Sequence, residues 1–210
     1  MLKKLSVALC VSSLLGCGVA IADPGTASGS IKFVGSVSHQ APSVLVKFGE
    51  TATALSGAAT TIQLTDCYAA ELDGGAFLND KAKSFQIVVQ RYNGTGYNHI
   101  TSATLELSGT TVETTGSSTN GWVLKNNATV TPAGNVGVGL RYLGKVAPEA
   151  SSLGDPVFAT SGSRTITESF AYEQLDPTFY FKAALQQVDT TKHISGGNVE
   201  ATLNVTVTYQ

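Results

Sequence analysis

Residues 199–210, the last twelve of the chain, read Val-Glu-Ala-Thr-Leu-Asn-Val-Thr-Val-Thr-Tyr-Gln. Apolar side chains occupy every second position up to Tyr209, and polar side chains stand between them. A period of two is typical of a β-strand that has one face in a core and the other in water. Chain ends usually fray, so a strong strand at the very end indicates an edge strand that pairs with a partner.

A second alternating stretch lies near the start of the chain. Residues 31–37 place Ile31, Phe33, Gly35 and Val37 on one side. The preceding residues, 23–29, read Asp-Pro-Gly-Thr-Ala-Ser-Gly and contain no core-forming side chain. Such a composition does not fold alone. We therefore expect a flexible arm that leads into a first strand.

Short alternating runs separated by Gly, Asn, Ser and Pro recur along the chain, and about ten such runs predict a β-sandwich. The expected strands are 30–38, 44–48, 60–67, 84–92, 102–107, 121–125, 135–142, 164–171, 178–187 and 199–209. Residues 144–163 contain two prolines and several Ser and Gly, and they are expected to form one long surface loop. No change of composition and no internal repeat divides the chain after residue 22, which indicates a single domain.

The first 22 residues have the order of an export signal, with a positive start, an apolar run over 5–15 and Ala-Ile-Ala before a cut between Ala22 and Asp23. The cut would release the chain from Asp23 onward. An alternative interpretation starts from Leu-Leu-Gly before Cys17, which loosely resembles a lipoprotein box. In that case Cys17 would carry a lipid, and the protein would be anchored in a membrane.

Charge and cysteine content narrow the class of protein further. The formal net charge is −2 and only 13% of the residues are charged, which argues against binding to nucleic acid or to a membrane surface. Cleavage after residue 22 leaves Cys67 as the one cysteine, unpaired, so no internal disulfide forms. We expect Cys67 to be a small buried side chain, and a reactive thiol is the less favoured alternative. The fold must then be held by its core or by a partner.

The sequence contains no pattern that is typical of a catalytic or metal site. His39, His99 and His193 lie far apart, and none stands at metal-ligand spacing from a Cys or a carboxylate. No Gly-x-Ser-x-Gly nucleophile motif is present. The glycines of 134–139 resemble a nucleotide loop only superficially, because alternating apolar residues run through them as a strand. We expect no enzyme activity, no cofactor and no metal.

Three stretches resemble the pilin subunits of chaperone–usher fimbriae, in the style of type 1 and P pilus shaft proteins. Residues 29–37, Gly-Ser-Ile-Lys-Phe-Val-Gly-Ser-Val, resemble the N-terminal extension of that family. Residues 61–67, Thr-Ile-Gln-Leu-Thr-Asp-Cys, resemble the segment that carries the family's second cysteine. Gly197, fourteenth from the C-terminus, and the penultimate Tyr209 are similar to the family's chaperone-recognition end. The family's first cysteine has no counterpart in 38–43.

The resemblance implies an all-β fold, an incomplete immunoglobulin-like β-sandwich that is completed by a donor strand from a partner. It implies a signal peptide (1–22), an N-terminal donor-strand extension that runs into the first strand (23–38) and a pilin domain (39–210). The donor strand would present Ile31, Phe33, Gly35 and Val37. The edge that accepts first a chaperone strand and then a donor strand would comprise Gly197, Val199, Ala201, Leu203, Val205, Val207 and Tyr209.

The function implied by the resemblance is a structural subunit of a surface fimbria, a shaft (major) pilin that serves cell adhesion. The implied partners are a periplasmic pilus chaperone, an outer-membrane usher, other copies of the chain and neighbouring pilins. The implied location is the cell surface, reached through the periplasm. Two alternatives stay open: an adhesive or minor fimbrial subunit that binds a host glycan or protein, and a secreted or lipid-anchored β-sandwich binding protein.

Overall fold

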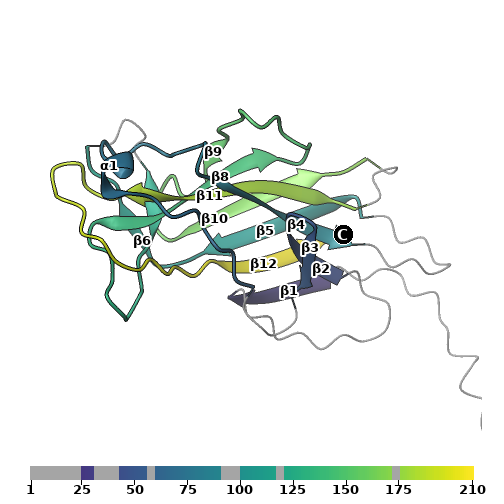
Figure 1. Cartoon of the computed structure of the whole chain (residues 1–210). Coiled ribbons are helices and arrows are strands. Elements are labelled where there is room, and N and C mark those ends of the chain that lie inside the picture. The colour runs from purple at the N-terminus through teal and green to yellow at the C-terminus, as the bar shows by residue number, and fades with distance from the viewer. Residues whose placement is uncertain (1–24, 31–42, 56–59, 91–99, 117–120, 172–175) are drawn as a thin grey trace, which may run out of the picture.

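The structure, a computed structural model, describes residues 25–30, 43–55, 60–90, 100–116, 121–171 and 176–210. These residues form twelve β-strands and one helical turn, α1 (Ala69–Leu72). The strands make two antiparallel sheets, which pack on each other around one hydrophobic core (Figure 1). The prediction of an all-β sandwich is confirmed.

The smaller sheet has four strands in the order β1-β12-β5-β10. They are β1 (Gly25–Ser30), β12 (Asn204–Tyr209), β5 (Ser102–Ser108) and β10 (Ser163–Ser169). Figure 1 shows β1 in purple alongside the yellow β12. The first described strand of the chain therefore lies at the edge of this sheet, beside the last strand.

The larger sheet has eight strands, seven of them in the order β3-β2-β4-β11-β8-β7-β6, with β9 paired to β8. They are β2 (Ser43–Phe48), β3 (Thr51–Ala54), β4 (Lys83–Gln90), β6 (Thr111–Glu113), β7 (Trp122–Lys125), β8 (Val136–Gly144), β9 (Asp155–Pro156) and β11 (Thr178–Gln187). Strands β3, β6 and β9 and the helical turn α1 are not expected from the sequence, and they are among the shortest elements. A run of two to four residues is too short to display a period.

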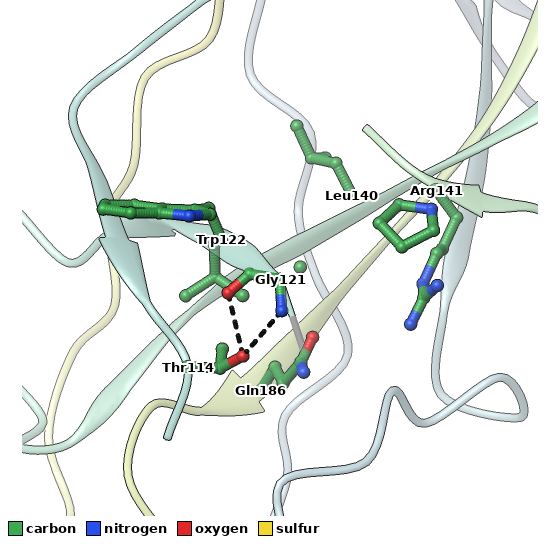
Figure 2. Close-up of a pocket in the computed structure, with 9 residues that line it drawn as sticks. Thr114, Gly121, Trp122, Leu140, Arg141 and Gln186 are labelled. Atoms are coloured by element: carbon green, nitrogen blue, oxygen red, sulfur yellow. Dashed lines mark hydrogen bonds between the residues drawn. The ribbon is translucent and has the colours of Figure 1, made fainter. Parts of the chain in front are cut away.

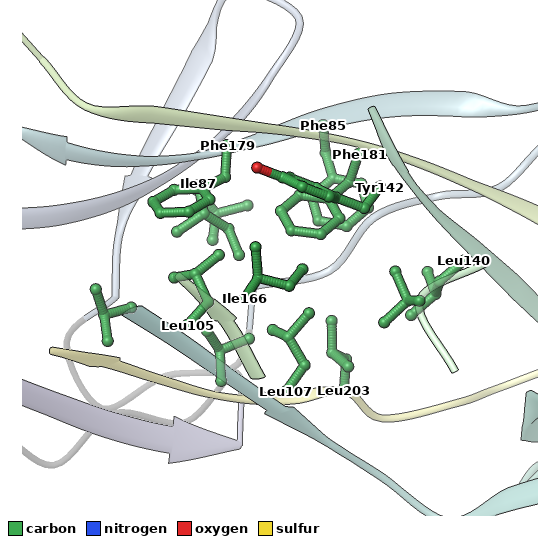
Figure 3. Packing of buried hydrophobic residues seen from close by; sticks show 14 of the residues in the cluster. Phe85, Ile87, Leu105, Leu107, Leu140, Tyr142, Ile166, Phe179, Phe181 and Leu203 are labelled. Atoms are coloured by element: carbon green, nitrogen blue, oxygen red, sulfur yellow. The ribbon is translucent and has the colours of Figure 1, made fainter. Parts of the chain in front are cut away.

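Alternation along the strands fills the core from both sheets. Val207 of β12 is fully buried from the side of the smaller sheet. From the larger sheet, Phe181 stacks on Phe85 with the ring centroids 5.2 Å apart (Figure 3). The Tyr142 hydroxyl on β8 donates a hydrogen bond to Glu168 on β10 at 2.9 Å, which joins the two sheets at their margin. Burial of these large side chains supplies most of the energy that holds the sandwich together.

Residues 60–67 do not form the expected strand. Ile62 and Leu64 are half-buried and pack against the core, so the alternation of this segment does mark a buried face. However, no strand of the described sheets pairs with the segment. Alternation indicates which side chains are buried, and it does not show whether a neighbouring backbone is available for a ladder.

The expectation of one surface loop over 144–163 is wrong in its second half. Val157 and Phe158 are almost completely buried, with exposed fractions of 0% and 1%. The Val157 amide donates to the carbonyl of Leu140 at 2.9 Å, and the Phe158 carbonyl accepts from the amide of Trp122 at 3.0 Å. Two apolar residues among Pro, Ser and Gly show no period, which is why the pattern suggested a loop.

Candidate functional site

The candidate site is the terminal strand β12 together with the residues that lead into it. Leu203, Val205, Val207 and Tyr209 are buried, with exposed fractions of 5%, 1%, 0% and 8%. Asn204, Thr206 and Thr208, which stand between them, are half-buried. One side of β12 pairs with β5 from Asn204 to Tyr209. The apolar positions of the terminal stretch therefore face the core, as alternation requires.

The other side of β12 is paired with β1 of the same chain. The two strands run antiparallel over six positions, from Gly25 opposite Tyr209 to Ser30 opposite Asn204. The residues opposite the buried Val207 and Val205 are Ala27 and Gly29. From the sequence, 31–37 and not 25–30 is expected to be the pairing segment, because no apolar alternation marks 25–30 as a strand.

Without β1, the side of β12 that faces away from β5 would be an open sheet edge. Residues 204–209 contain no charged residue and no proline, and natural edge strands use such residues to prevent pairing with other chains. The edge of β12 is thus chemically suited to accept a strand, and in this single chain that strand is β1.

The strand was expected to begin at residue 199, but β12 begins at Asn204. Val199 and Ala201 are half-buried and pack against the core. Between them, the Glu200 carbonyl accepts a hydrogen bond from the Asn127 amide at 2.7 Å. The segment before β12 is therefore extended and partly buried, but it bonds to the loop that follows β7 instead of to β5.

Gly197 lies where this segment crosses the same loop. It has a φ of 152°, and a Cβ added there would lie 2.7 Å from the amide nitrogen of Ala133. Just beyond it, the Asn198 carbonyl accepts a hydrogen bond from that amide at 2.9 Å. The close approach gives a structural reason for glycine at this position, independent of any contact with a chaperone.

Replacing Gly197 with Ala is expected to lower the free energy of unfolding by about 1–3 kcal/mol, because the backbone conformation is strained for an L side chain and its Cβ meets backbone atoms. Gly196→Ala is the matched control, since a Cβ at Gly196 meets no atom within 4 Å. Urea unfolding of both variants would measure the difference. Equal stability of the two variants would show that Gly197 has no structural role.

Cys67 is a free thiol and is half-buried instead of fully buried. Its Sγ lies 3.5 Å from the carbonyl oxygen of Thr65. Partial burial, and next the negative charge of Glu71, raise the pKa of the Cys67 thiol above its ordinary value. A raised pKa keeps the group protonated near neutral pH, which does not favour a nucleophilic role.

Other predicted residues lie outside the part of the chain that the structure describes. They are Ala22, Asp23, Ile31, Phe33, Gly35, Val37, His39 and His99. Among the described residues, no group of three or more His, Cys, Asp and Glu could hold a metal ion. Nor do the described residues include a helix that is long and apolar enough to span a bilayer.

The glycine-rich stretch 134–139 continues into a strand. Gly137 and Gly139 belong to β8, and a Cβ on Gly137 would lie 2.6 Å from the carbonyl oxygen of Leu124. Glycine is therefore placed there for close approach of neighbouring backbones, as expected from the alternation.

No protein-family model matches the chain. No curated protein matches it either. Among solved structures, the chain is similar to a Burkholderia pseudomallei antigen and type I fimbria protein, with 21% sequence identity over 89% of this chain and 97% of that chain. The TM-score of this match is 0.44, which is too low for the likeness to carry an argument about function.

Proposed function

We propose that the chain is a structural subunit of a surface fimbria and that it polymerises by donor-strand exchange, as a shaft pilin. The observation that carries the proposal is a row of unused backbone groups beside β12. Neither Val199 nor Ala201 makes a backbone hydrogen bond within the described part of the chain. Both residues are half-buried, and buried backbone groups in proteins are nearly always paired.

The direction of these groups supports the proposal. In an extended strand, successive residues point their N–H and C=O groups to opposite sides. Asn198 and Glu200 bond to the loop that follows β7. The backbone N–H and C=O groups of Val199 and Ala201 therefore point to the opposite side of this segment. Further along the chain, the same side of β12 is the one that pairs with β1. A longer donor strand would pair with the whole of 197–209.

The register of β1 aligns the apolar arm with residues 197–203, the half of the edge that pairs with no described strand. Continued without a shift from Ser30 opposite Asn204, the ladder would place Ile31 opposite Leu203, Phe33 opposite Ala201, Gly35 opposite Val199 and Val37 opposite Gly197. The large Phe33 would meet a small residue, and Gly35 would allow the arm to lie close to a half-buried Val. Odd-numbered arm residues thus share the core-facing side with odd-numbered residues of β12.

The energies favour a donor that uses the whole arm, 25–37, over β1 alone. Burial of Ile31, Phe33 and Val37 contributes roughly 1.5–3 kcal/mol each. The main-chain ladder adds about 1 kcal/mol for each of half a dozen or more bonds. Residues 25–30 consist of Gly, Thr, Ala and Ser and add little apolar area. A donor that uses all of 25–37 therefore binds more firmly than a strand limited to 25–30.

Donor and acceptor are different surfaces of one chain, so each contact is head-to-tail and the assembly can grow as an open filament. A periplasmic chaperone would lend a strand to the β12 edge until an outer-membrane usher presents the next subunit. The chain would be exported through the periplasm by its N-terminal segment and would end at the cell surface, in contact with copies of itself and with neighbouring pilins.

Cysteine cross-linking tests the exchange directly. Ser28 and Thr206 are register partners on β1 and β12. We expect fibres assembled from a mixture of Ser28→Cys and Thr206→Cys chains, both with Cys67→Ser, to give disulfide-linked dimers in non-reducing gels. A mixture of Ser28→Cys with Thr208→Cys is two residues out of register and serves as the control. Fibres in which no chain becomes linked to another would overturn the proposal.

A further inference from the structure

The loop that follows β7, residues 126–134, lies at the end of the β12 edge from which a donor arm would leave. The arrowhead of β1 points toward the start of β12 (Figure 1), and the ladder continued in the same register would end with Val37 opposite Gly197. A Cβ on Gly197 would meet backbone atoms of residues 131–133. Residues 198–200 therefore have this loop on one side and, on the other side, the half of the edge that pairs with no described strand.

Strand β7, which leads into this loop, is fixed at both of its ends. At its start, the Thr114 hydroxyl donates a hydrogen bond to the Gly121 carbonyl at 2.9 Å and accepts one from the Gly121 amide at 3.2 Å (Figure 2). At its end, the Lys125 amide donates to the carbonyl of Thr110 at 2.8 Å. The base of the loop therefore has a fixed position on the larger sheet.

The side chain of Asn126 ties the loop to the segment before β12. Its Nδ2 donates to the carbonyls of Ala133 and Asn198, both at 2.9 Å. Its Oδ1 accepts from the amides of Ala128 and Glu200, both at 3.0 Å. An amide side chain has two N–H donors and an oxygen that accepts two hydrogen bonds. The full capacity of Asn126 is thus used to hold the loop in one shape.

The tip of the loop carries an exposed apolar side chain on a strained backbone. Val130 is 69% exposed. Nδ2 of Asn198 donates to the Val130 carbonyl at 2.9 Å and to Oγ1 of Thr131 at 3.1 Å. Thr131 has a φ of 40°, which is unusual for a β-branched residue. A single exposed valine is common on protein surfaces, but strained backbone persists only where its surroundings hold it, and it is concentrated at functional sites.

The length of the chain between the arm and β2 indicates what would meet this tip. Residues 38–42 join the arm to Ser43, so they span at most about 20 Å. The arm and the loop would flank the segment before β12 on opposite sides, which places them roughly two strand spacings, or about 10 Å, apart. The end of the neighbouring sandwich that contains Ser43 and its ladder partner Gln90 is therefore within reach of Val130.

We propose that the tip of this loop, with Val130 at its centre, docks on the neighbouring copy whose arm occupies the β12 edge, at the end of that copy where β2 begins. Residues 126–134 contain no charged side chain, and the centres of protein interfaces are depleted of charge. The inference rests on the proposed donor-strand exchange and adds a second contact to it. The arm links the two chains, and the rigid tip sets the angle between successive sandwiches.

The dissociation of fibres in urea tests the contact. Val130→Asp is compared with Val146→Asp, which changes a valine of similar exposure, 73%, beyond the far end of β8. Both side chains are exposed in the single chain, so both variants are expected to fold. We expect fibres of Val130→Asp to dissociate about 10-fold faster or more, because the contact loses a buried valine and gains a charge. The disulfide between Ser28→Cys and Thr206→Cys chains is expected to form in both.

A direct measurement of the contact places the photo-reactive residue p-benzoylphenylalanine at position 130 or, as the control, at position 146. We expect illumination of fibres to link position 130 to peptides of another copy that include Ser43 or Gln90, and to give no such link from position 146. Equal dissociation of the two Asp variants, or no link between chains from position 130, would overturn the docking contact while the disulfide between 28 and 206 still forms. Loss of that disulfide in fibres with Val130 intact would overturn the strand exchange itself, and the docking contact with it.

Discussion

Deletion of residues 23–37 is expected to leave a subunit that still binds a pilus chaperone but forms no fibres. The deletion removes β1 and the apolar arm together, so β12 loses its partner on one side. Roughly six ladder bonds at about 0.5–1 kcal/mol each amount to a loss of about 3–6 kcal/mol. That loss is a large part of the stability of an ordinary domain. Electron microscopy of shed material and co-purification with the chaperone would record both outcomes.

A synthetic peptide with the sequence of 23–37 is expected to restore the truncated subunit. The peptide would occupy the β12 edge, and the stabilisation would grow with the logarithm of its concentration above Kd. A peptide that carries Phe33→Asp is the matched control, because it keeps the backbone donors and places a charge in the apolar ladder. We expect the Kd of this control peptide to be at least 100-fold higher, which corresponds to a loss of about 2.7 kcal/mol in binding free energy.

Two results would contradict this account. Long fibres from the truncated subunit would show that 23–37 is not the donor. Equal binding of the two peptides would show that the arm contributes its backbone alone and that the alternation of Ile31, Phe33 and Val37 has no role in assembly. In that second case the short β1 pairing would be sufficient.

The terminal strand could be predicted because its period of two extends over many residues. Leu203, Val205, Val207 and Tyr209 are buried as expected, although the strand begins only at Asn204 and Val199 and Ala201 are half-buried. The same signal located β2, β4, β5, β8, β10 and β11 to within a few residues. It was wrong at 60–67, where one face is buried but no described strand pairs with the segment, and in 144–163, where Val157 and Phe158 are buried without an alternating pattern around them. Periodicity describes burial, whereas sheet membership depends on distant segments.

At the candidate site, too, burial could be predicted from the sequence but strand pairing could not. The buried face of β12 follows from local sequence, but its pairing with 25–30 does not, because Gly, Ala, Ser and Thr carry no alternation of hydrophobicity. Nor could the pairing of Arg141 on β8 with Lys182 on β11, two buried cationic residues, be predicted. The two residues are 41 positions apart, and only the register of β8 against β11 places them opposite each other.

Replacement of Val207 by Asp is expected to prevent folding or to lower the free energy of unfolding by more than about 4 kcal/mol. Val207 has no exposed surface and lies in the middle of β12, opposite Leu105 on β5 and Ala27 on β1. An aspartate there would put an unpaired carboxylate into the core that both sheets share. Circular dichroism and urea unfolding would measure the loss.

Thr206→Asp is the matched control, because Thr206 is the preceding residue of the same strand and its side chain lies on the half-exposed face. We expect this variant to fold with a loss of less than about 1 kcal/mol, since a carboxylate at that position stays in contact with water. Donor-strand binding by Thr206→Asp should remain, because the main-chain groups of β12 are unchanged. If the two variants were equally destabilised, the cause would be the charge on the strand and not the burial of one face, and β12 would not be the core-facing acceptor strand that the proposed assembly requires.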